Sequence, residues 1–177
     1  MTDLARPAAT TTDPYLASLL EILGSRDPLQ VMAETPDALR AGIAGMTEAQ
    51  LSVPEAPGKW SARQMLGHLA DSELVGAFRF RMILAHERPG IPAYDQDAWA
   101  GRLHYDQADV TAVLDTFTAL RRANLWILER ATPEDRQRVG LHTERGAESL
   151  DFLMQIYAGH DLRHLRQLAR IRAAIGA

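Results

Sequence analysis

Apolar residues recur at helical spacing along most of this chain, and no stretch of any length alternates between apolar and polar with period two. The longest helical stretches cover about residues 61–86, 107–130 and 149–171, and a broken helix is predicted up to about residue 44. These four blocks show no internal repeat and no break between domains. The pattern therefore predicts an all-α four-helix bundle, with extra short helices at the N-terminus.

Residue types that favour helix starts precede these stretches. Three times an N-cap residue stands directly before a proline, at Asp13-Pro14, Asp27-Pro28 and Thr35-Pro36. These pairs predict a short helix over Pro14–Leu23 and two further starts within the broken helix. Ser61 and Gln64 form a capping box before the second block, and Ser149 can cap the last one.

The connections differ in length. Residues 47–60 are polar and rich in proline, and residues 88–97, "RPGIPAYDQD", form a long loop of the kind that often carries function. We expect a disordered tail over residues 1–12, rich in Ala, Thr and Pro, and one domain over residues 13–177.

Composition narrows the function classes. The chain has 177 residues, a net charge of −4 and no cysteine, so disulfides, zinc ribbons and a thiol of its own are excluded. A weakly acidic chain has no general attraction to nucleic acid or to anionic membranes. Its first residues lack a basic region followed by an apolar one, so we expect no signal peptide, and no apolar run is long enough to span a bilayer. We expect a cytoplasmic protein that binds neither nucleic acid nor membrane.

Two histidines lie four residues apart in the stretch "YAGHDLRHLRQL". His160 and His164 would share one helical face, and His68 falls on or beside the inward stripe of another helix. A bundle core is a standard place for a metal site built from facing helices. The alternative is a set of core histidines that form hydrogen bonds with carboxylates or water. His86 and His104 are expected to be solvated.

Several short sequence motifs resemble those of the DinB/YfiT-like family of metal-dependent four-helix proteins. They are "KWSARQMLGHLADSE", "FRFRMILA", "YDQDAW" and "GHDLRHLRQL", within a match that spans roughly residues 28–172. The resemblance implies an up-down-down-up bundle and a divalent metal held by His68, His160 and His164. Family members include thiol-dependent transferases and isomerases, metal hydrolases and homodimers.

Three imidazoles without thiolate suit Zn²⁺ or Ni²⁺ first, and also Fe²⁺ or Mn²⁺, with positions left open for a small-molecule substrate. The resemblance favours an S-transferase that activates a low-molecular-weight thiol such as bacillithiol, mycothiol or glutathione. A hydrolase that activates water at the metal is the first alternative. A non-catalytic bundle that binds a metal or small ligand is the second, because no separate general acid or base stands out.

Other residues are candidates for supporting roles. Asp161 stands where the HExxH zinc hydrolases have their glutamate base, and is either an orienting partner of a histidine or an exposed residue. Asp71, one turn after His68, is a comparable partner. Arg79 shares the face of His68 and needs a carboxylate, with Asp95 or Asp97 preferred, or an anionic substrate. The remaining pocket candidates are Tyr94, Asp95, Trp99, His142 and Tyr157.

Overall fold

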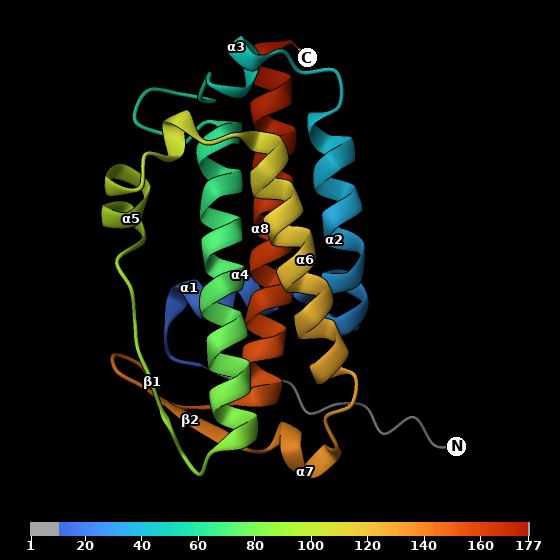
Figure 1. Ribbon diagram of the computed structural model, residues 1–177, viewed down its shortest axis with the longest axis vertical. Coiled ribbons are helices and arrows are strands. Elements are labelled where there is room, and N and C mark those ends of the chain that lie inside the picture. The colour runs from blue at the N-terminus through green and yellow to red at the C-terminus, as the bar shows by residue number, and fades with distance from the viewer. Residues whose placement is uncertain (1–10, 177) are drawn as a thin grey trace.

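A computed structural model gives the fold and describes residues 11–176; the predicted tail lies largely outside these described residues. Four long helices form the bundle: α2 (Pro28–Ile43), α4 (Ala62–Ala85), α6 (Val110–Leu128) and α8 (Leu150–Ile175). Helices α2 and α8 run in one direction, and α4 and α6 run in the other (Figure 1). The order along the chain is therefore up-down-down-up, as the family resemblance implied.

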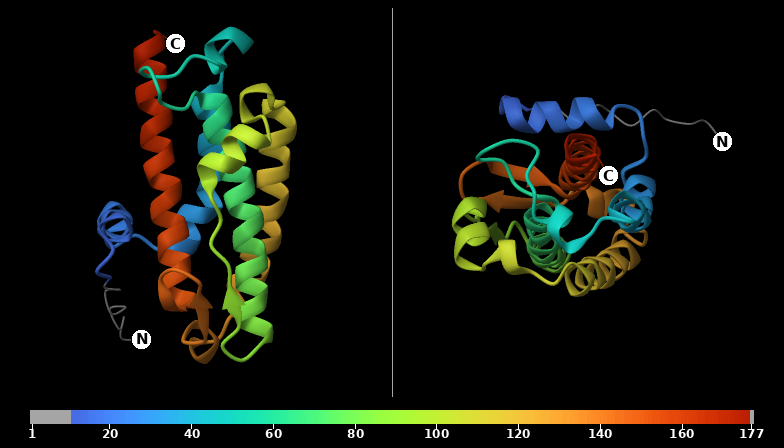
Figure 2. Two further views of the ribbon diagram at one scale, coloured as in Figure 1. Left: turned by 90° about the vertical axis from the view of Figure 1, so that its left-hand side faces the viewer. Right: turned by 90° about the horizontal axis from the view of Figure 1, so that it is seen from above.

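Shorter elements surround the bundle. Helix α1 (Pro14–Leu23) lies across α8, outside the bundle (Figure 2). The connection after α2 holds α3 (Glu48–Leu51), and the long connection after α4 holds α5 (Gln96–Arg102) and the 3-10 helix η1 (Tyr105–Gln107). Helix α7 (Pro133–Arg136) follows α6.

The sequence did not predict a small sheet at one end of the bundle. Strands β1 (Gly90–Ile91) and β2 (Val139–His142) pair in parallel, and β2 pairs with β3 (Gly146–Ser149) as an antiparallel hairpin. Strands of two to four residues are too short to show a period-two pattern. The sheet ties the long loop to the entry of α8 and brings His142 toward the bundle.

The helix starts follow the predicted caps, with one exception. Asp13 and Asp27 cap α1 and α2, and the Ser61–Gln64 capping box opens α4. The predicted start at Thr35-Pro36 is wrong, because α2 continues through Pro36 without a break. Proline cannot donate to the carbonyl oxygen four residues earlier, which belongs to Met32. Arg121 of α6 donates to that oxygen instead, at 2.8 Å.

A buried polar layer divides the apolar core into two clusters. One cluster gathers around Phe80, Leu128 and Leu153, and the other around Leu66, Phe117 and Leu168. Between them lie fully buried polar groups from three helices: Glu73, Arg121, Asn124 and Asp161. Arg121 pairs with both carboxylates, at 2.9 Å to Glu73 and 2.5 Å to Asp161. The bundle core thus carries a network of buried charges between two apolar clusters.

Candidate metal centre

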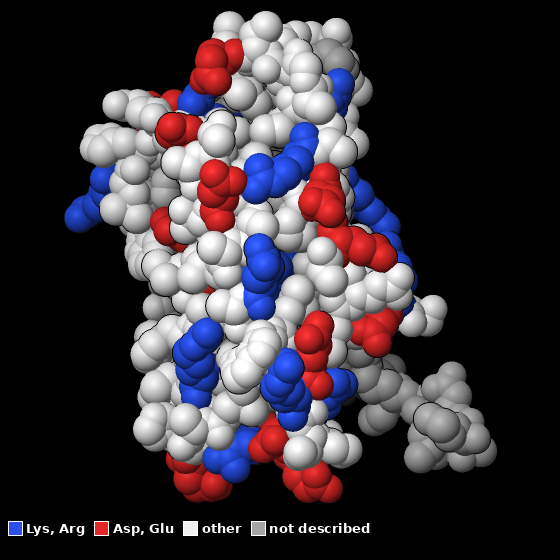
Figure 3. Space-filling model, turned by 45° about the vertical axis from the view of Figure 1, so that its right-hand side comes forward, with Lys and Arg blue, Asp and Glu red and all other residues white. Residues whose placement is uncertain are grey.

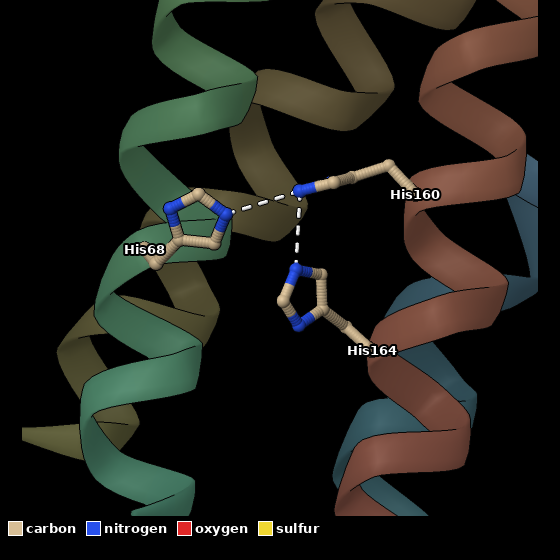
Figure 4. Close-up of side chains that lie close together, drawn as sticks. All are labelled: His68, His160 and His164. Atoms are coloured by element: carbon tan, nitrogen blue, oxygen red, sulfur yellow. Dashed lines mark hydrogen bonds between the residues drawn. The ribbon is translucent and has the colours of Figure 1, made fainter. Parts of the chain in front are cut away.

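Three histidines from two helices converge inside the bundle. His68 lies on α4, and His160 and His164 lie one turn apart on α8, so all three rings face the space between these helices (Figure 4). The Nε2 atom of His160 lies 3.0 Å from Nε2 of His68 and 3.1 Å from Nε2 of His164. Nitrogens that share one divalent ion at about 2.0–2.1 Å lie roughly 3.0–3.4 Å apart. Two of the distances fall in this range, and the ligand nitrogens of all three rings lie within 4.8 Å of one another, so the cluster can hold one ion.

Burial keeps these imidazoles neutral. Loss of hydration, reinforced by the neighbouring His164, lowers the pKa of His68 to about 3. The same loss of hydration lowers the pKa of His164 to about 4, against an opposing hydrogen bond to Gln167. The pKa of His160 is also lowered well below its usual value, first by burial and then by the two other histidines. Neutral imidazoles are the form that binds a metal.

Gln167 fixes the orientation of one ring. Its Oε1 atom lies 2.8 Å from Nδ1 of His164, and an amide oxygen can only accept, so Nδ1 carries the proton. Nε2 of His164 is then left with a lone pair that faces the other two histidines. Nδ1 of His68 is buried without a protein hydrogen-bond partner. An ion shared by the Nε2 atoms fits this donor set, because Nε2 of His160 carries either one proton or one lone pair and can hydrogen-bond to only one of its two neighbours.

The two aspartates predicted as partners of the histidines lie elsewhere. Asp161 is neither exposed nor bonded to a histidine, because Arg121 engages both of its oxygens. It therefore belongs to the polar layer of the core. Asp71 accepts a hydrogen bond from the hydroxyl of Tyr105, at 2.5 Å, which ties η1 to α4.

A pocket of about 170 Å³ opens beside the histidines. Its walls come from α1, α4, the long loop, the β2–β3 turn and α8. They include the expected residues Arg79, Tyr94, His142 and Tyr157, together with His68 and His160. Asp95 and Trp99 do not line it: Asp95 caps α5, and Trp99 packs on Tyr94 with 4.7 Å between ring centres.

The predicted ion pair of Arg79 is wrong. Its guanidinium donates to the carbonyl oxygen of Pro92 at 2.5 Å and lies 3.2 Å from Nε2 of His142. Asp95 is exposed and accepts from the main chain of its own helix, so the loop does not turn this carboxylate toward α4.

Some residues around the site gave no clear signal in the sequence. Helix α1 contributes Tyr15, Leu16 and Leu19 to the pocket, although it lies outside the bundle. Gln167 stands three residues after His164, a spacing that places it on the same helical face. That spacing could have identified Gln167 as a partner of the histidine.

The surface gives two further observations. On the face drawn in Figure 3, basic and acidic side chains are interspersed and form no large patch of one sign. Within residues 11–176, none of the helices combines the length and apolar character needed to cross a bilayer.

Comparison with known proteins places the chain in a family. The model of the DinB superfamily matches residues 32–168. "Putative metal-dependent hydrolase YfiT" of Bacillus subtilis is 28% identical over 149 residues, which cover 84% of each chain. A "Putative metal-dependent hydrolase" of Bacillus pumilus is 31% identical over 141 residues, covering 79% of this chain and 80% of the relative.

A solved structure agrees with this result. The structure of YfiT from Bacillus subtilis, described as "a probable metal-dependent hydrolase with an unusual four-helix bundle topology", matches with a TM-score of 0.80. The sequence identity is 25%, and the match covers 97% of this chain and 93% of the other. Sequence and fold lead to the same conclusion: this chain belongs to the DinB superfamily.

Proposed function

We propose that the protein is a divalent-metal-dependent hydrolase whose metal ligands are His68, His160 and His164. The observation that carries the proposal is the convergence of three neutral imidazole nitrogens, with His160 at 3.0 Å from His68 and 3.1 Å from His164. His68 and His160 also line a pocket. Relatives named as metal-dependent hydrolases support the same reaction class. Imidazole ligands suit Zn²⁺ or Ni²⁺, with Fe²⁺ and Mn²⁺ as further candidates.

When bound, such an ion lowers the pKa of a coordinated water to about 7 and polarises the carbonyl group of a substrate. The chain itself supplies the orientation of the ligands and the walls of the pocket. Gln167 holds the Nδ1 proton of His164 at 2.8 Å, so that Nε2 stays free to bind. Leu19, Leu153 and Ile156 make part of the wall apolar.

Tyr157 and Tyr94 supply hydroxyl groups to the same pocket. Burial is the main cause that raises the pKa of both phenols above the usual value, so both remain protonated. A protonated phenol donates a hydrogen bond. These two residues can therefore hold a carbonyl oxygen of a substrate in place. Asp161 takes no part in proton transfer, because Arg121 occupies it.

The S-transferase expectation rests on the family resemblance alone. A thiol cosubstrate would have to come from outside, since the chain contains no cysteine. The transferase remains a prediction that the following test separates from the hydrolase.

The test compares metal content and activity in the full-length protein. We expect purified protein to carry a transition metal and to cleave small esters or amides without added thiol, at a rate that rises through a pKa near 7. His160→Ala should lose both the metal and the activity. His86→Ala is the matched control, because His86 is exposed at the end of α4.

Two results would contradict the proposal. Full metal content in His160→Ala would show that the ligands lie elsewhere. Activity that appears only with bacillithiol, mycothiol or glutathione would replace the hydrolase with the transferase.

A further inference from the structure

The buried arginines of this protein differ in how their charge is balanced. Arg121 has two carboxylate partners and Arg63 has one, Glu48. Arg79 is as buried, with 5% of its surface exposed, yet no carboxylate of the described residues lies within 4.0 Å of its nitrogens. A buried cation without an anionic partner costs free energy, so its retention needs an explanation.

The hydrogen bonds of Arg79 leave donors unused. Its Nη2 atom donates to Pro92, but its Nε atom is buried and has no protein acceptor. Arg79 lines the same pocket as His68 and His160, so an anion bound in this pocket would lie against its positive charge.

His142 adds a second donor at this place. Its Nδ1 atom lies 3.2 Å from the main-chain nitrogen of Glu144 and 3.4 Å from that of Arg145. Both are N–H donors, so Nδ1 accepts, and in the neutral ring the proton is on Nε2. Nε2 of His142 lies 3.2 Å from Nη2 of Arg79, which can only donate, so this contact is a hydrogen bond only in the other tautomer of the ring. In the tautomer set by the two main-chain donors, Nε2–H and Nη2 are both donors. Two donors that face each other without an acceptor between them form a place for an anion.

We propose that Arg79 and His142 form a subsite for the carboxylate group of the substrate, whose scissile bond lies at the three histidines. The proposal rests on the proposed hydrolase and adds a substrate class to it: small amides or esters that carry a carboxylate. The pocket, at about 170 Å³, holds only a small molecule.

The proposed carboxylate subsite and the histidine cluster lie at different levels along α4. Arg79 follows His68 by eleven residues on α4, which is about 16 Å along the helix axis. The Arg79 side chain shortens this distance, because helical side chains point toward the N-terminus of their helix. The carboxylate is thus held apart from the bond that is cleaved. Few donors converge here, which suits the two oxygens of a carboxylate better than the three or four of a phosphate.

The test uses matched charged and neutral probes. Acetate, N-acetylglycine and succinate are titrated calorimetrically into the zinc-loaded protein, beside the corresponding amides and inorganic phosphate. We expect each carboxylate to bind at least about tenfold more tightly than its amide, as a charge-assisted hydrogen bond provides. Arg79→Met should reduce this ratio to near one, and Arg79→Lys should retain part of it. Arg166→Met is the control, because Arg166 is exposed on α8.

A carboxylate could also bind the metal directly, so the titrations are repeated after chelation. If the metal-free protein still binds carboxylates more tightly than amides, Arg79 and not the metal binds the carboxylate. If this preference disappears with the metal, the proposal is overturned. Equal binding of carboxylates and amides, an unchanged ratio in Arg79→Met, or tighter binding of phosphate would also overturn it. If Arg79→Met does not fold, the ratio of carboxylate to amide affinity in the wild type and in Arg79→Lys tests the proposal instead. Failure of the hydrolase is distinct, because it appears as missing metal or missing cleavage while the carboxylate preference is unaffected.

Discussion

Arg121 donates a hydrogen bond to the main-chain carbonyl oxygen of Met32, the acceptor that Pro36 leaves without a helical donor. The same guanidinium pairs with Glu73 and Asp161. One side chain therefore joins α2, α4, α6 and α8 at the level between the two apolar clusters. The proline inside α2 is compatible with the fold because a partner from another helix replaces the lost bond.

Replacing Arg121 should destabilise the protein strongly. Arg121→Met leaves two buried carboxylates without their partner, and breaking such a network costs about 3–5 kcal/mol in the free energy of unfolding. Chemical denaturation should show this loss. A loss below about 1 kcal/mol would show that Glu73 and Asp161 are neutral in the folded protein.

The link to Pro36 can be measured with a double-mutant cycle. Pro36→Ala restores an N–H donor to the carbonyl oxygen of Met32. The oxygen is then no longer orphaned when Arg121 is removed. We expect Arg121→Met to cost about 1 kcal/mol less in the Pro36→Ala background than in the wild type. Strictly additive effects would mean that the bond to Met32 contributes nothing.

Much of the fold could be predicted from the sequence, because long amphipathic helices and their caps are local features. Ser61 and Gln64 show this: both halves of their capping box depend on residues three apart. Pro36 shows the limit, since the donor that replaces its missing N–H comes from Arg121, 85 residues later in the chain. The short strands were missed for a related reason, because pairing partners and not local pattern determine them.

The candidate site, like the fold, could be predicted from the sequence only in part. The convergence of His68 with His160 and His164 followed from helical faces and the family resemblance. The roles of Asp161 and Arg79 did not, because their partners lie on other helices and in the loop. Asp161 has the sequence position of a catalytic base but the surroundings of a core ion pair, and no spacing rule distinguishes these.

Gln167 should influence metal affinity without touching the metal. Gln167→Leu removes the acceptor that keeps the proton on Nδ1 of His164, so part of the ring population turns a proton toward the other histidines. Such partners are typically worth 10- to 100-fold in metal affinity. We expect Zn²⁺ affinity, measured by competition with a chromophoric chelator, to fall about tenfold. Gln167→Glu keeps an acceptor and should retain the wild-type Zn²⁺ affinity. An equal loss of affinity in both variants would refute the orienting role of Gln167.

The metal-free protein should lose stability as the pH falls below about 6.5. Histidines of the unfolded chain titrate near this value, whereas burial lowers the pKa of His68 to about 3 and that of His164 to about 4 in the folded state. The unfolded chain therefore binds more protons between about pH 6.5 and 4, and the free energy of unfolding decreases by up to ~1.4 kcal/mol per pH unit for each histidine. Above about pH 6.5 this contribution is constant.

Carboxylates also titrate at the acid end of this range, so the comparison uses variants. His68→Ala should make the slope of stability against pH shallower between pH 6.5 and 4, and His86→Ala, at an exposed position, should not. Thermal denaturation after chelation gives the slopes. Identical slopes for all three proteins would show that His68 takes up its proton as readily in the folded state as in the unfolded one.

Gly159 is required for α1 to pack on α8. A Cβ atom at this position would lie 2.3 Å from the main-chain oxygen of Leu19 and 2.8 Å from its carbonyl carbon. Main-chain atoms of a helix cannot yield locally, so Gly159→Ala should displace α1 and cost about 1–3 kcal/mol of stability. Because α1 supplies Tyr15, Leu16 and Leu19 to the pocket, the variant should also bind small ligands more weakly.

Gly42→Ala is the matched control for this substitution. Gly42 also lies in a helix, but its added Cβ would meet the end of the Leu168 side chain, at 2.4 Å, and a side chain can change rotamer. We therefore expect Gly42→Ala to cost less stability than Gly159→Ala and to leave the pocket unchanged. Hydrogen exchange separates the two effects, since only Gly159→Ala should lower the protection of the α1 amides. Equal protection of α1 in both variants would show that α1 tolerates a side chain beneath it.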